Sequence, residues 1–352
     1  MWGSKQVKSP HPARNSHSTN MRLHVFFAGF LFDRAFASPA DSQLPPQYPL
    51  LLLSGEDEPH PSPPGARLPV PAAYYRRFSE QTFIGTHNAA AVRSEENNWS
   101  LSGNQYFNVS AQLKAGIRLL QAQGHRDPEG GTDIRLCHFN CALMDGGSIY
   151  EHLATVKKWL DDNPYEVVTL LFVNTGVPLL HWIKAYYETE MDLISYVPPV
   201  EKRGWRMRTS DWPTISEMVA TNRRVVSFLS SGANEDLVPF LLPEFGYMFE
   251  TNFGIEAPDQ YTCAPARPRW PGSYIPDRLS LVNHFLYAKF LGFRYPNASY
   301  ANTTNAAGFH VGELGEHAAR CRGLYGRRPN FFLVDFFNEG AVFDVEYGMN
   351  AY

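Results

Sequence analysis

Two histidines in similar local sequences are the residues of this chain best suited to chemistry. His87 lies in Thr82-Phe-Ile-Gly-Thr-His-Asn88, where a short apolar strand pattern ends at a glycine. His138 follows the strand pattern of residues 134–136 in the same way. Imidazole exchanges protons near neutral pH, so two such side chains can serve as base and acid in one displacement. The pattern therefore predicts a two-histidine acid–base site.

Each motif is weak alone, because most histidines in a chain of 352 residues bind nothing. The specificity comes from six motifs taken in order: Gly85-Thr-His-Asn88, Gly116-Ile-Arg118, Leu136-Cys-His138, Trp159-Leu-Asp-Asp-Asn-Pro-Tyr-Glu-Val167, Trp212-Pro-Thr-Ile215 and Asn330-Phe-Phe-Leu-Val-Asp-Phe-Phe-Asn338. Together they resemble the X-domain of phosphatidylinositol-specific phospholipase C. Their spacing is most similar to that of the secreted, fungal-type phospholipase-C-like phosphodiesterases, and the resemblance covers residues 75–350.

The resemblance implies a fold and a role for each histidine. The fold is a TIM-type (β/α)8 barrel, with distortion allowed, in a single α/β domain. His87 is then the base that takes the proton of an attacking inositol hydroxyl, and His138 is the acid that protonates the departing diacylglycerol oxygen. Asp335, at the end of the last predicted strand, is the candidate for orienting one imidazole. A hydrogen-bonded carboxylate at a strand end is the equal alternative for Asp335.

The second predicted strand departs from the family pattern. One branch of the family binds Ca²⁺ through the Asn after the first His and acidic residues on this strand, and the other branch places an Arg there. This chain has Asn88 but carries Gln121 and Gln123 on the strand. Two neutral amides make a poor calcium cage, so we expect no metal. His125 shares the face of the glutamines by strand parity and is the candidate for positive charge, or else lies in the following loop.

Three functions stay open at this stage. The first is a phosphoric diester hydrolase of the phosphatidylinositol phospholipase C type, acting on a phospholipid or a related inositol phosphate. The second is a catalytically impaired barrel that binds an inositol phosphate or a surface glycan, and the third is an enzyme for another phosphodiester. The expected substrate contacts are Asn88, Gln121, Gln123, His125 and Glu250, although a solvated strand end is the alternative for Glu250.

The elements that must position these residues alternate between strand and helix patterns. Several strands are near-continuous apolar runs, which are typical of a parallel sheet covered on both faces. Eight such strands fit a closed barrel, and no Gly-x-Gly-x-x-Gly motif supports an open doubly wound sheet. The predicted strands are residues 82–86, 116–123, 133–138, 166–173, 223–229, 246–251, 279–287 and 330–337.

The N-terminal part of the sequence divides into three segments before the barrel at 73–352. Residues 1–20 are polar and predict a disordered extension. Residues 21–37 hold a basic residue, an apolar run and Ala35-Phe-Ala37, which indicate a secretory signal peptide; a buried hydrophobic patch is the alternative. Residues 38–72 are rich in proline and predict a linker.

Secretion agrees with two further patterns. Four Asn-x-Ser/Thr sequons, at Asn98, Asn108, Asn297 and Asn302, predict glycosylation. The four cysteines permit three connectivities, and we predict the one with the disulfides Cys137–Cys141 and Cys263–Cys321.

The net charge of −4 gives no sign of a nucleic-acid partner. We expect an extracellular monomer that makes peripheral contact with a membrane.

Overall fold

The computed structural model describes residues 72–269 and 277–351. The predicted extension, signal peptide and all but the last residue of the predicted linker lie outside this part of the chain. Within it, no helix combines the length and the apolar character that spanning a membrane requires.

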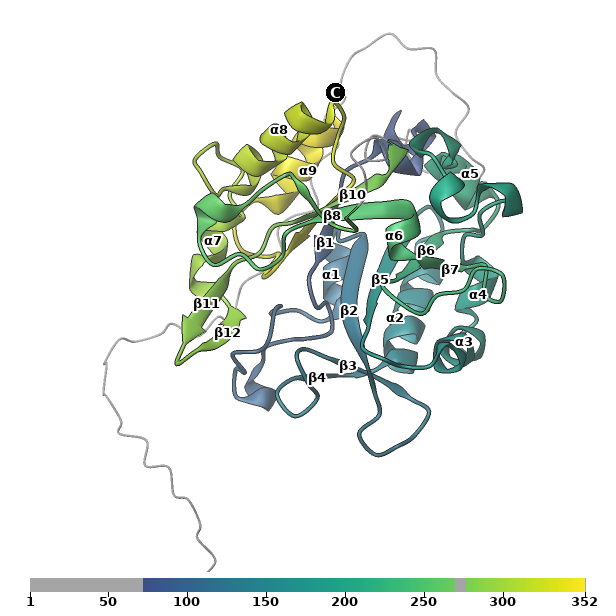
Figure 1. The fold of residues 1–352 in the computed structure, drawn as a ribbon, viewed down its shortest axis with the longest axis horizontal. Helices are drawn as coiled ribbons and strands as arrows, with labels where there is room; N and C mark the ends of the chain where they lie inside the picture. Colours follow the sequence, from purple (N-terminus) through teal and green to yellow (C-terminus); the bar gives the residue numbers. More distant parts are fainter. Residues whose placement is uncertain (1–71, 270–276, 352) are drawn as a thin grey trace, which may run out of the picture. The chain divides into compact units, whose positions relative to one another are not determined.

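Eight parallel strands of the described chain form a curled sheet in the order β7-β6-β5-β2-β1-β13-β10-β8 (Figure 1). The register pairs Thr86 with Leu120 on one side and with Val334 on the other, so the carboxyl ends of β1, β2 and β13 lie together. The strands are β1 (Phe83–Thr86), β2 (Leu119–Arg126), β5 (Val168–Asn174), β6 (Val225–Leu229), β7 (Leu241–Pro243), β8 (Met248–Thr251), β10 (Leu279–Asn283) and β13 (Phe331–Val334).

The barrel is open between β7 and β8. β7 is three residues long and ends at Pro243, which has no N–H to donate to a neighbouring strand. The one-turn helix α6 (Glu244–Tyr247) connects β7 to β8. The other edge of β8 pairs in antiparallel fashion with β9 (Pro265–Arg267). The expected distortion of the barrel is therefore a gap at this position.

One of the eight predicted barrel strands is wrong. The segment predicted at 133–138 forms β3 (Ile134–Cys137), which pairs antiparallel with the end of β2 and with β4 (Asp145–Ser148). A short turn follows β2, which is enough for a hairpin but not for the crossover that a parallel strand requires. The missing barrel strand is β7, whose three residues are too few to give a strand pattern.

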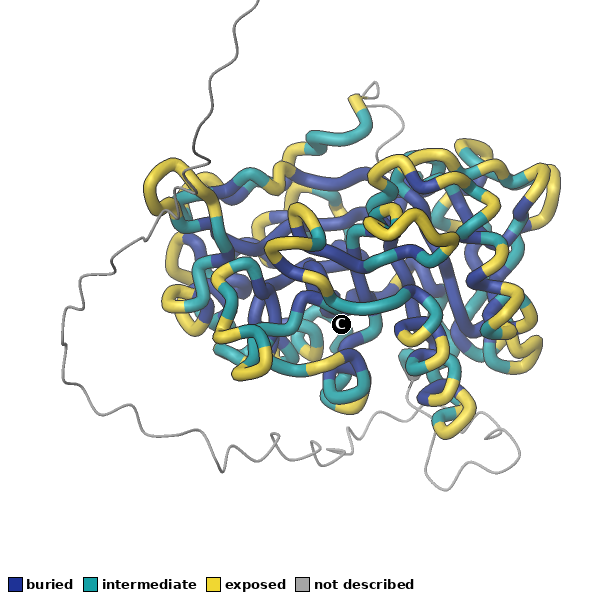
Figure 2. Tube along the Cα trace, turned by 90° about the horizontal axis from the view of Figure 1, so that it is seen from below, coloured by how far each residue is buried: buried dark blue, intermediate teal, exposed yellow. Residues whose placement is uncertain are grey.

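Helices cover the outside of the sheet. The molecule therefore has one hydrophobic core between the sheet and the helices and a second core inside the barrel. Side chains that alternate along the strands point either into the barrel, like Phe83 and Leu119, or outward against helices, like Ile84 and Leu120. Figure 2 shows the buried strands between half-buried and exposed connections. The main helices are α1 (Val109–Ala115), α2 (Ile149–Asp162), α3 (Leu179–Glu188), α5 (Ile215–Ala220), α8 (Leu314–Tyr325) and α9 (Val342–Asn350), with short α4 (Met191–Ile194) and α7 (Ala301–Thr304).

A separate hairpin follows β10. Its strands β11 (Tyr287–Phe290) and β12 (Phe293–Pro296) pair with each other in a two-stranded sheet. Figure 1 shows the hairpin projecting beyond the barrel sheet. Because it follows the carboxyl end of β10, it lies at the end of the barrel where β1, β2 and β13 also finish.

Candidate active site

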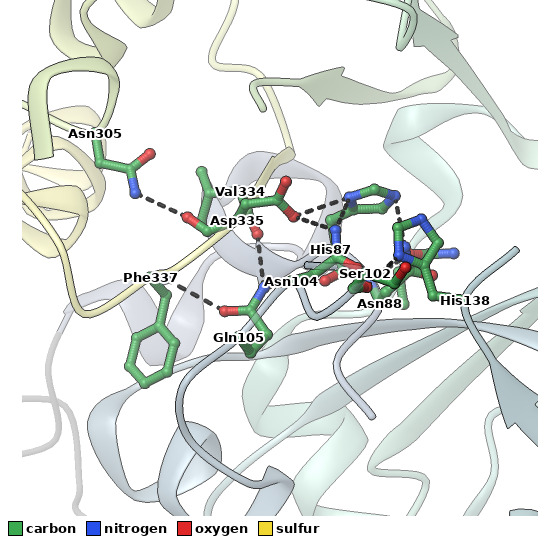
Figure 3. A network of polar contacts seen from close by, with 11 residues as sticks. His87, Asn88, Ser102, Asn104, Gln105, His138, Asn305, Val334, Asp335 and Phe337 are labelled. Atoms are coloured by element: carbon green, nitrogen blue, oxygen red, sulfur yellow. Dashed lines mark hydrogen bonds and ion pairs between the residues drawn. The ribbon is translucent and has the colours of Figure 1, made fainter. Parts of the chain in front are cut away.

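His87 and Asp335 come from the neighbouring strands β1 and β13. The backbone N–H of His87 donates to the carbonyl of Val334 at 2.9 Å and extends the ladder past the end of β1. The register then places Nδ1 of His87 2.9 Å from Oδ1 of Asp335 (Figure 3). A carboxylate accepts hydrogen bonds, so Nδ1 carries the imidazole proton and Nε2 keeps its lone pair.

Two amides and one aromatic ring fix the His87 imidazole. Asn104 Nδ2 donates to Oδ1 of Asp335 at 2.8 Å, on the Nδ1 side of the ring. Asn88 Nδ2 lies 3.0 Å from Nε2 of His87 and donates to it. Phe285 stacks on the imidazole with ring centroids 3.8 Å apart and an angle of 9° between the planes. The ring therefore has a defined tautomer and little freedom to rotate.

His138 lies on the loop after β3 and faces the same site. Its Nδ1 donates to the carbonyl of Ser102 at 2.6 Å, which leaves Nε2 as the atom available to a ligand. Nε2 is buried and has no hydrogen-bond partner among the described residues. The ring centroids of His138 and His87 are 5.9 Å apart. Burial lowers the pKa of His138 to about 3, and the neighbouring His87 adds to this effect. His138 is therefore neutral at pH 7 in the unliganded protein.

The residue after each of these three side chains has a left-handed backbone. The φ angles are 46° at Asn88, 62° at Phe139 and 46° at Phe336. Non-glycine residues adopt this conformation rarely, and at a cost of about 1–3 kcal/mol. The backbone thus turns sharply at the residue that follows each of the three side chains. Each functional residue therefore directly follows its strand and lies just before the turn into a loop.

Buried amide side chains hold these turns in place. Gln121 Oε1 accepts the backbone N–H of Asn88 at 2.7 Å. Gln105 Nε2 donates to the carbonyls of His87 and Val334 at 3.0 and 3.1 Å. Asn305 Nδ2 donates to the carbonyl of Asp335 at 2.9 Å. The backbone around His87 and Asp335 is therefore satisfied by side chains from three different segments of the chain.

The structure brings His87, Asn88, Gln121, His138 and Asp335 together, whereas no contact joins Gln123 or Glu250 to the two imidazoles. His125 is close enough to His138 for its charge to lower the pKa of His138. Gln123 lies on β2 and is half-buried. His125 lies opposite Arg135 in the β2–β3 ladder, and burial lowers its pKa. A lowered pKa makes His125 a poor source of positive charge. The substrate contacts expected of these residues stay predictions.

Glu250 is buried on β8, away from solvent. Its carboxylate forms an ion pair with Arg267 and accepts from Asn283 Nδ2 at 3.1 Å. The neighbouring Glu244 is also buried, and its burial, together with the charge of Glu250, raises its pKa to about 8. This group lies beside the gap in the barrel between β7 and β8. A contact between Glu250 and a sugar hydroxyl stays a prediction.

The residues around His87 do not fit a calcium ion. The free oxygens are Asn88 Oδ1 on the Nε2 side of the ring, and Asn104 Oδ1 and Asp335 Oδ2 on the Nδ1 side. Ca²⁺ takes six to eight converging oxygens, usually with several carboxylates. Elsewhere in the described chain, Cys263, His317 and Cys321 have metal-like spacing, but both sulfurs belong to a disulfide.

Both predicted disulfides are confirmed. Cys137–Cys141 closes the loop that carries His138, and Cys263–Cys321 joins the segment after β8 to α8. A bridge that closes so short a loop restricts few unfolded conformations, so the first one chiefly positions the loop. The sequons Asn98, Asn108 and Asn302 are exposed and Asn297 is half-buried, and their glycosylation stays a prediction.

Several contacts of the site were missed from the sequence, among them those of Gln105 and Asn305. Asn104 and the carbonyl of Ser102 lie in a polar loop, where no pattern distinguishes one residue from its neighbours. Phe285 had a detectable signal, because it lies two residues after a strand that ends at the same end of the barrel as His87.

An α/β barrel in which an imidazole and a carboxylate follow two parallel strands, with a second imidazole on the hairpin beside them, is of the phospholipase-C-like class. The chain belongs to the PI-PLC X family, whose model (PI-PLC X 1) matches residues 74–350. The "PI-PLC X domain-containing protein 1" of Arthroderma benhamiae is 37% identical over 277 residues, which are 78% of this chain and 86% of that protein. An "Uncharacterized secreted protein" of the same fungus is 34% identical over 78% of this chain and 62% of that protein.

Solved structures agree on the fold. A phosphatidylinositol-specific phospholipase C from Staphylococcus aureus covers 78% of this chain and 94% of its own, with a TM-score of 0.54 and 13% identity. The enzyme of the same name from Listeria monocytogenes covers 79% and 96%, with a TM-score of 0.53 and 12% identity. At this identity the likeness concerns the barrel alone, and the chemistry of this chain must be argued from its own side chains.

Proposed function

We propose that this chain is a secreted phosphoric diester hydrolase of the phosphatidylinositol phospholipase C type. The observation that carries the proposal is the arrangement of two imidazoles with ring centroids 5.9 Å apart. Each has its Nδ1 proton held by an oxygen, from Asp335 or Ser102, so that Nε2 is the reactive atom of both. One base and one acid at this separation suit a displacement at phosphorus.

His87 acts as the base in this proposal. Its Nε2 takes the proton of a substrate hydroxyl, and the hydroxyl oxygen forms a bond to the neighbouring phosphorus. The amide of Asn88, which occupies Nε2 in the free protein, moves to the substrate. Asp335 stabilises the imidazolium that forms, because its Oδ1 already accepts from Nδ1.

His138 acts as the acid. The bond between phosphorus and the leaving oxygen breaks as Nε2–H of His138 gives its proton to that oxygen. This requires a protonated ring, whereas burial holds the pKa of free His138 at about 3. A bound phosphodiester brings a negative charge next to the ring and favours the imidazolium. Substrate binding and protonation of His138 are thus linked, and the acid forms only in the complex.

The apolar rim around the site supports action at a lipid surface. We use "apolar rim" for the exposed side chains of the loops at the carboxyl ends of the strands: Trp99, Leu101, Phe139, Leu143, Phe290, Leu291 and Phe293. Leu291 and Phe293 are 82% and 77% exposed at the tip of the β11–β12 hairpin. Exposed apolar groups of this extent mark interaction sites. One solved structure of the Staphylococcus aureus enzyme concerns the modulation of its membrane binding.

Secretion rests on the two disulfides and on a relative named as a secreted protein. Disulfides persist in oxidising compartments and are rare in the cytosol.

A barrel that binds without cleaving is the second candidate, and one observation favours it. In the described chain, the contacts of His87 and His138 are with neutral groups, Asp335 and each other. No arginine or lysine of this part reaches them, although a cation would stabilise the charge on a reacting phosphate. An inositol phosphate would bind such a site through its hydroxyls, with Asn88 Oδ1 as a free acceptor.

Release of water-soluble inositol phosphate from labelled phosphatidylinositol tests the proposal. We expect activity that survives a chelator and falls by about a hundredfold in His87→Ala and in His138→Ala. His310→Ala is the matched control, because its ring is exposed and pairs with Glu313. No release by the wild-type protein, combined with calorimetric binding of an inositol phosphate, would decide for the binding barrel.

A further inference from the structure

A cavity of about 480 Å³ lies at the opposite end of the barrel from the two histidines. It is lined by the side chains of Arg77, Arg322, Arg327 and Arg328, by Glu80, and by the hydroxyl groups of the turn at 209–210. Residues 77–80 precede β1 and residues 327–328 precede β13, whereas His87 and Asp335 follow these strands. The amino ends of β1 and β13 thus meet at this cavity, which we call the arginine pocket.

The charge of the arginine pocket is not compensated. Some arginines elsewhere in the described chain pair with carboxylates, as Arg118 does with Glu166 and Arg320 with Glu316, whereas Arg223 donates to backbone carbonyls. None of the four pocket arginines forms such an ion pair within the described residues. Glu80 is the one carboxylate among the described lining residues, and its Oε2 accepts the backbone N–H of Arg77. Four guanidinium groups therefore share a cavity with one carboxylate.

Backbone carbonyls hold three of these guanidinium groups in place. Arg77 donates to the carbonyl of Trp212 at 2.8 Å, and Arg328 Nε donates to the carbonyl of Met349 at 2.6 Å. Arg327 donates to the carbonyl of Arg278 and to Asn330 Oδ1, while its Nε is buried without a partner in the described chain. Arg322, near the end of α8, has no hydrogen-bond or ion-pair partner among the described residues. The pocket is thus built from arginines that keep donors free.

Such a cluster is costly without a ligand, because like charges repel in a partly desolvated space. Burial, followed by the charges of Arg76 and Arg322, lowers the pKa of Arg328. The guanidinium group matches phosphate and sulfate oxygens through paired N–H donors. A cavity of 480 Å³ exceeds what one oxyanion fills and lies in the range of small-molecule sites.

We propose that the arginine pocket binds a small polyanion that carries two or more phosphate or sulfate groups. The four guanidinium groups pair with the oxyanions, and the hydroxyl groups of Thr209 and Ser210 donate to the remaining oxygens. This ligand binds independently of the histidine site, because the two sites lie at opposite ends of β1 and β13.

Isothermal titration calorimetry on the full chain tests the proposal with two probes. Tripolyphosphate represents a phosphorylated ligand, and a trisulfated heparin disaccharide represents a sulfated one. Binding of either probe, weakening with added salt, supports the pocket, and the tighter probe identifies the source of the oxyanion groups. Failure of both probes to bind at millimolar concentration and low ionic strength would overturn it.

Matched variants place the binding at the pocket. Arg322→Gln should weaken binding by roughly tenfold or more, whereas Arg320→Gln, on the same helix but paired with Glu316, should bind as the wild type does. His87→Ala should also bind normally, because its side chain belongs to the other site. Equal losses in Arg320→Gln and Arg322→Gln, or loss in His87→Ala, would contradict the assignment.

Thermal unfolding without the probes gives a second readout. Removing one of several like charges relieves repulsion, so Arg322→Gln should keep or raise the Tm of the free protein. The Tm of wild type should rise with tripolyphosphate or with the disaccharide, whichever binds, because binding to the native state adds stability. A lower Tm of the free Arg322→Gln variant would show that Arg322 has a structural partner. It would contradict the claim that the positive charge of the arginine pocket is uncompensated.

Discussion

Nδ1 of His87 lies 2.9 Å from Oδ1 of Asp335, although 248 residues separate the two in the sequence. The parallel register of β1 and β13 creates this contact, because it places the two residues after paired strand ends. Asn104 donates to the same carboxylate oxygen and fixes its direction. The carboxylate therefore selects the tautomer of His87 and stabilises its protonated form.

Replacing Asp335 tests this relationship. Asp335→Asn keeps the shape but allows the amide to donate to Nδ1, which moves the imidazole proton to Nε2 and removes the base. We expect kcat/KM for a phosphodiester to fall by roughly a hundredfold or more. Asp162→Asn, whose carboxylate forms an exposed pair with Lys158, is the control. Equal activity of Asp335→Asn and wild type would show that the contact is structural.

The protonation of His138 should depend on the ligand. Burial lowers its pKa to about 3, so in the free protein its ring resonance should titrate below pH 5. A phosphate group at Nε2 would raise this pKa through its negative charge. NMR titration with and without an inositol phosphate measures both values. A free His138 that titrates near pH 6.5, or a bound one that does not shift, would contradict the linked acid.

The sequence indicated the barrel, and it indicated that His87 and Asp335 lie at one end of it. His87 and Asp335 each follow a strand pattern, and parallel strands bring such positions to one end of a barrel. His138 follows β3, which is antiparallel, so its place in the site depends on the β2–β3 hairpin, which was not predicted. The gap between β7 and β8 could not be predicted, because it follows from the brevity of β7 and from the pairing of β8 with β9. Neither property leaves a periodic pattern in the sequence.

Side-chain partners that depend on loops were also beyond the sequence. Strand parity places Arg118 and Gln121 on opposite faces, and Arg118 pairs with Glu166 at 2.8 Å whereas Gln121 contacts the backbone of Asn88. Parity could not indicate that Gln121 binds a backbone N–H. That contact depends on the left-handed backbone conformation of Asn88 in the loop after β1. The alternation of residues along β2 carries no information about this loop.

Gln121 should matter for stability through that contact. Gln121→Leu keeps the volume but leaves the buried N–H of Asn88 without its acceptor, at a cost of about 1–3 kcal/mol in the free energy of unfolding. Gln121→Glu keeps an acceptor and should cost less. Urea denaturation measures both, with the half-buried Gln123→Leu as a control on the same strand. Equal effects of the three substitutions would show that the bond contributes little.

The tip of the β11–β12 hairpin should bind lipid. Phe290 and Phe293 are opposite each other in the hairpin and, with Leu291, are largely exposed. Replacing all three by Ser should weaken binding to phosphatidylinositol vesicles by roughly a thousandfold or more, because each buried apolar side chain contributes about 1.5–3 kcal/mol. Cleavage of a water-soluble phosphodiester should not change.

Leu324→Ser provides the matched control for the hairpin, because this exposed leucine lies on α8 at the other end of the barrel. Co-sedimentation with vesicles measures binding for both variants. If the hairpin variant sediments as wild type does, the hairpin is not the lipid contact. If it loses activity on the soluble substrate as well, the substitution has disturbed the site instead.

His152 should make the protein sensitive to acid. Its ring is buried between α2 and Phe172 of β5, and burial lowers its pKa to about 4, below the unfolded value of about 6.5. As pH falls through the window from 6.5 to 4, the unfolded state binds a proton that the native state excludes. Stability present above pH 6.5 is therefore lost, by roughly 2 kcal/mol at pH 4.5.

His152→Leu removes this group, so its free energy of unfolding should fall by roughly 2 kcal/mol less than that of wild type between pH 7.5 and 4.5. Glu346, whose burial raises its pKa to about 8, acts in the opposite direction in both proteins and cancels in the difference. His310→Leu, at an exposed position, should keep the wild-type pH dependence. Urea denaturation at each pH gives the comparison. Parallel curves for His152→Leu and wild type would show that His152 accepts its proton as readily in the native protein as in the unfolded chain.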